Sequence, residues 1–412
     1  MIAHLPGSML IIDGSYGEGG GQVLRTALAL AVITGRPVRI ERIRAGRRKP
    51  GLQPQHLTGV RAAARVCAAR VEGDRLDSQA LTFSPQSHPQ AGSHTFDVAQ
   101  VAKGGSAGAV SLVLQTVLLP LALADGPSQL TLRGGTHVAW SPPFDYVKRV
   151  YLPTLARMGV TAKVQIERWG WYPIGGGEVQ ATVGGAGSKE QDARSKAQGA
   201  AGSKEQGAGS KMQAVGSTED TSRTAGDEER MQDVPDGADA ARTRWTGLDL
   251  RQRGELLRVR GLSASSNLPK HIRTRQEGAA LYALRSSGVN ARIDVVDAPS
   301  KGQGTAVFLW AECENAVAGF ASLGEIGKPA ERVADEAAHD LLAYLQGDAA
   351  LDCHLADQLV LPMALASGPS QFTTERVTKH LLTVAWVVNQ FFPGRVRVEG
   401  VEGEPGACWI GE

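Results

Sequence analysis

The sequence predicts a mixed α/β protein in which a large unit carries a second, smaller α/β unit. Apolar residues make up 42% of the 412 positions, whereas aromatic residues make up only 5% and glycines number 50. This composition is typical of a sizeable core built from strands, helices and tight turns, and it argues against an aromatic-rich β-sandwich. Short apolar strands alternate with amphipathic helices in a rhythm that recurs about every 80 residues. A polar stretch then separates the first 183 residues from the rest.

The first unit begins with an apolar strand at Met9–Ile12, a glycine-rich turn, and a helix over Gln22–Thr34. Val23, Leu24, Ala27 and Leu28 give that helix an apolar face, and the following glycine is a typical stop. The same patterns predict strands at Val38–Ile43, Leu81–Phe83, Thr95–Val98 and Gln129–Arg133, and helices at His56–Cys67, Ala109–Ala124 and Asp145–Met158.

Residues 184–244 interrupt this pattern. Gly, Ala, Ser, Lys, Glu, Gln and Asp dominate the segment, and the pentapeptide GSKEQ occurs at both Gly187–Gln191 and Gly202–Gln206. So few apolar residues cannot offset the ~1–2 kcal/mol per residue that ordering a backbone costs. We therefore expect a low-complexity, disordered insertion, either an inert expansion of a surface loop or a regulatory segment.

The pattern resumes at Trp245. It predicts strands at Leu256–Gly261, Arg292–Val296 and Thr305–Ala311, and helices at Pro269–Ser287 and Ala330–Leu345. We assign residues 245–349 to the smaller α/β domain, and residues 1–183 and 350–412 to the large domain.

Charge and cysteine usage limit the possible partners and compartments. The net charge is only +2, but Arg36–Arg70 holds ten basic residues and one acidic residue, a net charge of +9; such a run is either a polyanion-binding surface or a solvated basic face. Four widely spaced cysteines without a CxxC pair argue against a zinc or redox motif and fit a reducing compartment. The N-terminus lacks a signal-peptide pattern, and the apolar run at Ala109–Ala124 is shorter than the ~20 residues of a membrane span. We expect a soluble, cytoplasmic protein, and the sequence leaves monomer and homodimer open.

The glycine-rich turn Gly14–Gln22 lies between a strand and a helix, where backbone N–H groups converge on phosphate groups. It matches neither GxGxxG nor GxxxxGK[ST], and for the glycines alone a tight turn is the simpler interpretation. Glu18 in the middle of the turn would repel a phosphate unless a divalent cation bridged the two. Glu18 is therefore our metal candidate, with Arg25 one helical turn further on.

Two arginines, Arg44 and Arg47, follow a predicted strand, where guanidinium groups can bind a terminal phosphate in bidentate fashion. The neighbouring His56 is either an acid/base or, more commonly, a helix cap. Gln115, inside an apolar helix, needs a partner that is either backbone or a ligand, and the same ambiguity applies to Asp357 and Gln358 of the segment Leu355–Pro362.

His380 follows Thr378, a predicted helix N-cap, and would occupy the first turn of that helix. The positive end of the helix dipole disfavours imidazolium, so a neutral imidazole there could attack phosphorus. Taken alone, however, a histidine in this position more commonly just fills a helix start.

Nine segments, in order, resemble the RNA 3'-terminal phosphate cyclases, and the resemblance covers nearly the whole chain outside 184–244. They are Asp13–Arg25, Ile43–Arg47, Lys49–Leu52, Gln55–Leu57, Leu112–Thr116, Gly134–Thr136, Trp171–Gly177, Leu355–Pro362 and His380–Thr383.

The resemblance implies a large domain of three repeated βαβαββ units with an inserted, smaller thioredoxin-like domain. It implies a ligase that uses ATP and a divalent metal, Mg²⁺ or Mn²⁺, to convert an RNA 3'-phosphate into a 2',3'-cyclic phosphate through a covalent histidine–AMP and an RNA–adenylate. Carried over residue by residue, it implies that His380 is the nucleophile, that Arg25, Arg44 and Arg47 are further catalytic groups, and that Glu18 binds the metal. Gln55, with Arg44 and Arg47, would contact the RNA end. The implied nucleotide-site residues are Gln115, Pro142, Phe320, His354, Asp357 and Gln358.

Two features depart from the family pattern: His354 stands where some members carry a tyrosine, and the insertion at 184–244 has no counterpart. Two rival functions also remain. A cyclase-like scaffold of ribosome assembly would lack the nucleophilic histidine, and an enolpyruvyl transferase, which shares the repeated unit, would need no such histidine.

Overall fold

The computed structural model describes residues 8–101, 106–186 and 245–411. The predicted insertion at 184–244 therefore lies outside the described residues, apart from residues 184–186. None of the helices in the described ranges combines the length and the apolar character needed to cross a membrane.

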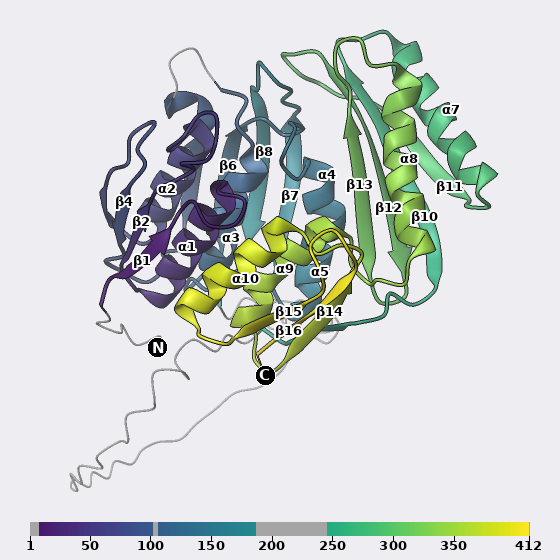
Figure 1. The fold of residues 1–412 in the computed structure, drawn as a ribbon. Coiled ribbons are helices and arrows are strands. Elements are labelled where there is room, and N and C mark those ends of the chain that lie inside the picture. The colour runs from purple at the N-terminus through teal and green to yellow at the C-terminus, as the bar shows by residue number, and fades with distance from the viewer. Residues whose placement is uncertain (1–7, 102–105, 187–244, 412) are drawn as a thin grey trace, which may run out of the picture.

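The large domain consists of three βαβαββ units (Figure 1). In the first, β1 and β2 are parallel and the other strand pairs are antiparallel, which gives the sheet order β1-β2-β4-β3. Its elements are β1 (Leu10–Asp13), α1 (Gly21–Thr34), β2 (Val38–Glu41), α2 (Pro54–Val66), β3 (Arg70–Glu72) and β4 (Leu81–Ser84).

The second unit has the equivalent strand order, β5-β6-β8-β7. Its second helix is one continuous run in which α4 and α5 flank a π-helical segment at Val147–Tyr151. Its elements are β5 (Ser93–Asp97), a 3₁₀ turn (Val98–Val101), α3 (Val110–Ala122), β6 (Ser128–Gly134), α4 (Phe144–Tyr146), α5 (Leu152–Met158), β7 (Ala162–Arg168) and β8 (Gly177–Val183).

The third unit repeats the order as β9-β14-β16-β15, so the predicted three-fold repetition is confirmed. The chain leaves this unit after β9 and returns to it at α9. Its elements are β9 (Asp249–Leu250), α9 (Cys353–Leu365), β14 (Ser370–Thr374), α10 (Lys379–Phe391), β15 (Val396–Glu399) and β16 (Gly406–Ile410). The sequence prediction began the smaller domain at residue 245, whereas β9 pairs with β14 in the large domain.

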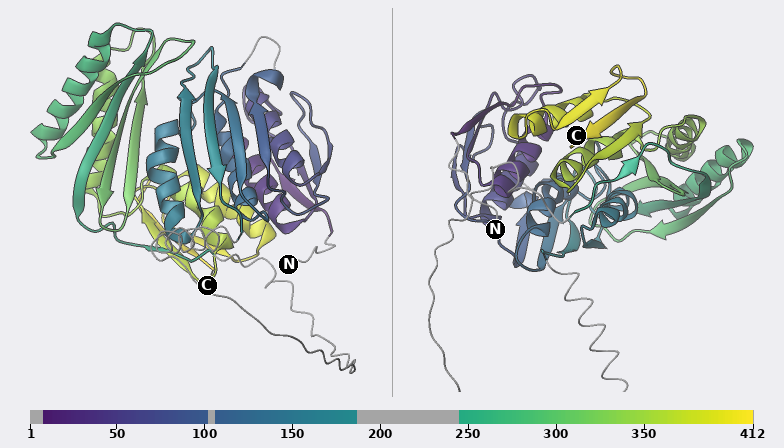
Figure 2. Two further views of the ribbon diagram at one scale, coloured as in Figure 1. Left: turned by 180° about the vertical axis from the view of Figure 1, so that it is seen from behind. Right: turned by 90° about the horizontal axis from the view of Figure 1, so that it is seen from below.

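The smaller α/β domain lies between β9 and α9, with the strand order β11-β10-β12-β13 and two helices on one side of the sheet (Figures 1 and 2). Its elements are β10 (Leu256–Ser266), α7 (Lys270–Ser286), β11 (Ala291–Asp297), β12 (Gly304–Cys313), β13 (Val317–Leu323) and α8 (Ala330–Gln346).

The central strand β12 is buried on both faces of this smaller sheet. Side chains alternate along a strand, so Val307 and Leu309 of β12 join the core formed with α7 and α8. Phe308 and Trp310 point the other way and belong to the core of the large domain. Phe308 meets Tyr146 edge to face, with 6.4 Å between ring centroids. The smaller domain is therefore packed directly against the second unit of the large domain.

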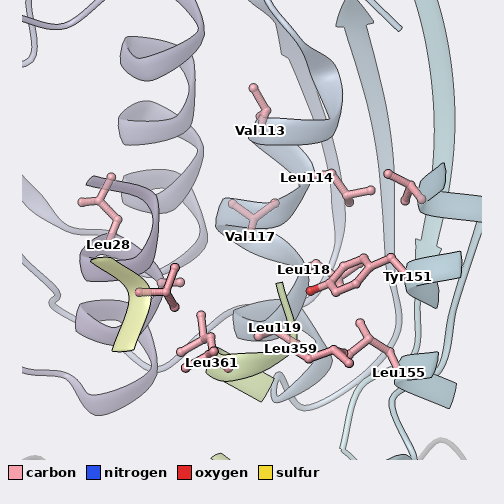
Figure 3. Close-up of a cluster of buried hydrophobic side chains, with 14 of the residues drawn as sticks. Leu28, Val113, Leu114, Val117, Leu118, Leu119, Tyr151, Leu155, Leu359 and Leu361 are labelled. Carbon is pink, nitrogen blue, oxygen red and sulfur yellow. The ribbon is translucent and has the colours of Figure 1, made fainter. Parts of the chain in front are cut away.

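The large domain buries its helices between its sheets. Helix α1 contacts α3 and α10, and α10 contacts α9. Leu28 of α1, Val117 of α3 and Leu359 of α9 belong to one buried cluster in this core (Figure 3). The inner helices are apolar on more than one face because each has helical neighbours on several sides, and this packing brings together the N-terminal ends of α1, α9 and α10.

Candidate active site

The glycine-rich loop lies directly on α10. Gly17 has a φ of +64°, and a Cβ placed there would lie 2.2 Å from Thr383 Oγ1. No side chain fits in that space, and the left-handed backbone favours glycine. The sequence motif therefore does more than make a turn: it allows the β1–α1 loop to contact the helix that carries His380.

His380, Glu18 and Arg47 meet at this contact. Thr378 Oγ1 accepts a hydrogen bond from Leu381 N at 3.0 Å, which confirms the predicted N-cap of α10. His380 Nε2 lies 3.2 Å from Glu18 Oε2, and Arg47 Nη2 donates to the same carboxylate oxygen at 2.8 Å. The imidazole retains 46% of its side-chain exposure, whereas Glu18 retains 14%. A solvent-accessible imidazole thus faces a largely buried carboxylate that a guanidinium neutralises.

The environment favours neutral imidazole at His380. Burial lowers its pKa below the ordinary histidine value; Glu18 opposes this effect, and the positive charges of Arg25 and Arg47 reinforce it. Its place in the first turn of α10 acts in the same direction. A histidine held neutral in this way has a free lone pair at neutral pH.

A pocket beside this group collects Arg25, Gln115, Asp357 and Gln358 from three different helices. Burial lowers the pKa of Arg25 to about 10 and raises that of Asp357 to about 8, although Arg25 itself opposes the rise at Asp357. Arg25 Nε is buried and has no hydrogen-bond partner among the described residues. The pocket is lined by Gln22, Arg25, Thr26, Gln115, Leu119, Tyr151, Asp357, Gln358, Leu361 and Val384.

The two predicted glutamines bond to each other. Gln115 Nε2 donates to Gln358 Oε1 at 2.8 Å, and Gln358 Nε2 donates to the backbone oxygen of His354 at 2.8 Å. These hydrogen bonds link α3 to α9, although Gln115 and Gln358 are more than 200 positions apart in the sequence. The amide of Gln115, which the sequence left without an assigned partner, therefore has a protein partner at the edge of the pocket.

The other residues of the β2–α2 segment mostly hold the segment itself in place. Arg44, in a left-handed conformation with φ of +54°, donates to the backbone oxygens of Lys49 and Gly51. Gln55 Oε1 accepts from Ala109 N at 3.0 Å, which fixes the start of α3. His56 Nδ1 accepts from Gln53 N at 3.2 Å as part of a capping box, and burial lowers the pKa of His56 to about 3. His56 is thus a neutral helix cap.

The remaining predicted nucleotide-site residues lie further apart. His354 is exposed at the start of α9, with its ring edge-on to Tyr146 at 6.4 Å. Pro142 precedes α4, the helix that carries Tyr146. Phe320 does not line the pocket: its ring is buried in the core of the smaller domain and packs on Tyr344 at 5.5 Å.

Asp352 connects these segments and was not found from the sequence. This fully buried carboxylate caps α9 through His354 N and Leu355 N, and it also accepts from Tyr146 Oη and from Gly319 N of the smaller domain. An aspartate directly before a helical pattern is an N-cap signal, and that signal was available in the segment Leu351–His354.

The arrangement fits an anionic, phosphate-bearing ligand. Helix α1 begins without a side-chain cap or an acidic residue in its first turn, so its N–H groups can bind an anion. A Cβ at Gly21 would lie 2.4 Å from His56 Nε2 and 2.8 Å from Arg25 Nη1, so the glycine keeps this end of the helix open. The unpartnered Nε of Arg25 offers a further donor.

Glu18 is the carboxylate beside His380 that could contact a metal ion. Within the described ranges, no group of three or more His, Cys, Asp and Glu residues could hold a metal ion. Magnesium is commonly bound by one or two carboxylates together with substrate phosphates. The residues present therefore fit a divalent cation that arrives with a nucleotide, and Glu18 is the side chain that would contact it.

Comparison with known proteins gives a consistent match along the chain. A sequence model of the family described as RNA 3'-terminal phosphate cyclase matches residues 16–398. A protein of Nostoc punctiforme with that name is 45% identical over 390 residues, which cover 95% of this chain and 96% of the relative. A protein of the same name from Methylococcus capsulatus is 46% identical, over 96% of this chain and 94% of the relative. One from Archaeoglobus fulgidus is 38% identical, over 95% of this chain and 98% of the relative.

Proposed function

The chain belongs to the RNA 3'-terminal phosphate cyclase family, and from this we propose that it uses ATP to convert an RNA 3'-phosphate into a 2',3'-cyclic phosphate. The observation that carries the proposal is the position of His380. Its imidazole is accessible, is held neutral, and lies 3.2 Å from a carboxylate that also contacts Arg47. Neither a scaffold protein nor an enolpyruvyl transferase needs this arrangement.

In the first step, His380 attacks the α-phosphorus of ATP. A phosphorus–nitrogen bond forms, the bond to the β-phosphate breaks, and pyrophosphate leaves with the electron pair. Arg47 and the open N-terminus of α1 are suited to stabilise charge that develops on the phosphate oxygens. A divalent cation at Glu18, when bound, would neutralise part of the charge of the departing pyrophosphate.

In the second step, an oxygen of the RNA 3'-phosphate displaces His380 from the adenylate. The imidazole returns to its neutral state, and the RNA end becomes a phosphoanhydride. A phosphate monoester repels nucleophiles through its own charge, whereas AMP is a good leaving group. The vicinal 2'-hydroxyl then attacks the RNA phosphorus, AMP departs, and the ring closes with the advantage of an intramolecular reaction.

The pocket formed by Arg25, Gln115, Asp357 and Gln358 is suited to the sugar and α-phosphate of the nucleotide. Besides the paired amides, the acidic residue Asp357 and the basic residue Arg25 line the pocket. At neutral pH the raised pKa of Asp357, about 8, leaves this carboxyl largely protonated. It can then donate a hydrogen bond to a sugar hydroxyl.

The test uses RNA that carries a 5' label and a 3'-phosphate, incubated with ATP and Mg²⁺. We expect one AMP per RNA and a 3' end that resists phosphatase. An RNA whose last sugar lacks the 2'-hydroxyl cannot cyclise and should accumulate as the adenylate. If neither RNA changes while ATP and Mg²⁺ are saturating, the proposed function is wrong.

The state of the cysteines bears on the cellular compartment of the protein. All four cysteines, Cys67, Cys313, Cys353 and Cys408, are buried and unpaired. Free cysteines are typical of the reducing cytoplasm, and we propose that the protein acts there.

A further inference from the structure

An aromatic stack lies beside the candidate active site and takes no part in the mechanism described above. Tyr16 of the glycine-rich loop stacks on Trp386 of α10, with ring centroids 3.9 Å apart and an angle of 12° between the rings. The Trp386 ring covers one face of Tyr16, yet Tyr16 remains 39% exposed. No second aromatic ring stacks on Tyr16 in the part of the chain that the structure describes.

Tyr16 and Trp386 lie on the same two segments as Glu18 and His380. Tyr16 N donates to Asp13 O at 3.2 Å and Gly19 N donates to Tyr16 O at 3.0 Å, so the loop that presents Tyr16 is the one that presents Glu18. Trp386 lies six residues beyond His380 on α10, roughly 9 Å along the helix axis. An RNA whose 3'-phosphate lay at His380 would therefore have its last nucleotides close enough to reach this part of α10.

Exposed basic side chains lie on the two segments that carry the stack or are paired with residues of those segments. Arg42, with 66% of its side chain exposed, contacts Asp13. Lys379, with 61% exposed, lies at the start of α10 and pairs with Glu402 at 3.6 Å. Arg47 of the β2–α2 loop is 43% exposed and contacts Glu18, two residues beyond Tyr16. Exposed aromatic rings among basic groups are the surface that binds single-stranded nucleic acid, because every base has a face that can stack and every linkage carries a negative charge.

Packing alone accounts for only part of this arrangement. Gly17, next in the loop, already brings the backbone against Thr383, so the loop and α10 are in contact without Tyr16. A residue whose purpose was to fix the loop would be covered by its surroundings, whereas a large part of Tyr16 is open to solvent.

We propose that the Tyr16–Trp386 stack is a platform for a base in the last two nucleotides of the RNA, continuing the stack outward from Tyr16. This inference rests on the proposed function, because it takes the RNA 3' end as the substrate. Stacking does not depend on the identity of the base, so the platform would favour single-stranded RNA ends of any sequence. Arg42 and Lys379 would pair with the phosphates of the same nucleotides.

The two half-reactions separate this role from a structural one. Adenylation of His380 needs ATP but no RNA, so it reports whether the loop and α10 are intact. We expect Tyr16→Ala to raise the KM for RNA by roughly 5- to 150-fold, the usual range for loss of one base stack, with a far smaller change in adenylation. Tyr16→Phe keeps the ring and should restore the wild-type KM.

The matched control is Tyr282→Ala, because Tyr282 is 76% exposed on α7 of the smaller domain and should leave the KM for RNA unchanged. A second measurement uses the wild-type protein with RNA that is abasic at the last, the penultimate or the sixth position from the 3' end. One of the first two should raise the KM as Tyr16→Ala does, and Tyr16→Ala should add nothing further with that RNA.

Equal losses in adenylation and RNA use by Tyr16→Ala, or an unchanged KM with every abasic RNA, would overturn the platform. A wild-type protein that forms neither an adenylate nor a cyclic end would instead contradict the proposed function, so the two failures are distinguishable.

Discussion

Removing the carboxylate of Asp352 should destabilise the protein strongly, because four donors from three segments converge on it. Asp352 is 0% exposed. Its Oδ1 accepts from Tyr146 Oη at 2.8 Å, His354 N at 3.0 Å and Leu355 N at 2.9 Å. Its Oδ2 accepts from Gly319 N at 3.2 Å.

The magnitude follows from what Asp352→Ala leaves behind. Loss of the N-cap of α9 costs about 1 kcal/mol. The hydroxyl of Tyr146 and the N–H of Gly319 stay buried without a partner, at about 1–3 kcal/mol each. Burial raises the pKa of Asp352 and is opposed by His354 and the donors, so removing the charge returns part of this cost. We expect a loss of about 3 kcal/mol in the free energy of unfolding.

Urea denaturation followed by tryptophan fluorescence measures this loss. Tyr146→Phe, which removes one donor and leaves the ring, should cost about 1 kcal/mol. The control is Asp249→Ala, whose carboxylate is 51% exposed and paired with Arg251, and it should change stability by less than about 0.5 kcal/mol. If Asp352→Ala is no more destabilising than Asp249→Ala, the inferred network does not join the two domains.

Two further predictions concern the pocket. Gly21→Ala places a Cβ 2.4 Å from His56 Nε2 and 2.8 Å from Arg25 Nη1, so the rate of adenylation should fall roughly 10- to 100-fold while the protein stays folded. The control is Gly278→Ala, where the Cβ meets no heavy atom within 4 Å. Equal adenylation rates for the two variants would contradict the assignment of Gly21 to the nucleotide site. Asp357 has a pKa of about 8 in the folded protein against 3.8 for a free aspartate, so its contribution to stability is complete below pH 3.8 and is lost as pH rises toward 8. Asp357→Asn should therefore gain stability relative to wild type between pH 5 and pH 8 in urea titrations, and a difference that is flat or falls with pH would show that the carboxyl is not held protonated.

Much of the fold could be predicted because most elements carry their own pattern. The helices that became α1, α3, α8 and α10 were placed to within a few residues by apolar periodicity and caps. The sequence patterns did not predict strands β9 and β13. β13 contains Gly319 at a site of close approach, and β9 is only two residues long, so neither shows a clear alternation.

Local sequence patterns predict less of the candidate site than of the fold. Glu18 and His380 are separated by most of the chain and meet only because α1 packs against α10. The bond between Gln115 and Gln358 likewise depends on how the repeats pack. Residue patterns identified Thr378 as a cap and His56 as a possible cap, whereas the grouping of the site came from the family resemblance.

Covalent adenylation of His380 is the central claim, and it can be measured before any RNA is added. The protein is incubated with ATP labelled at the α-phosphate and Mg²⁺, and label bound to the denatured protein is counted before and after acid treatment. We expect acid-labile label on the wild type and on His339→Ala, whose histidine is exposed on α8 of the smaller domain. We expect none on His380→Ala. Undiminished label on His380→Ala would contradict the account.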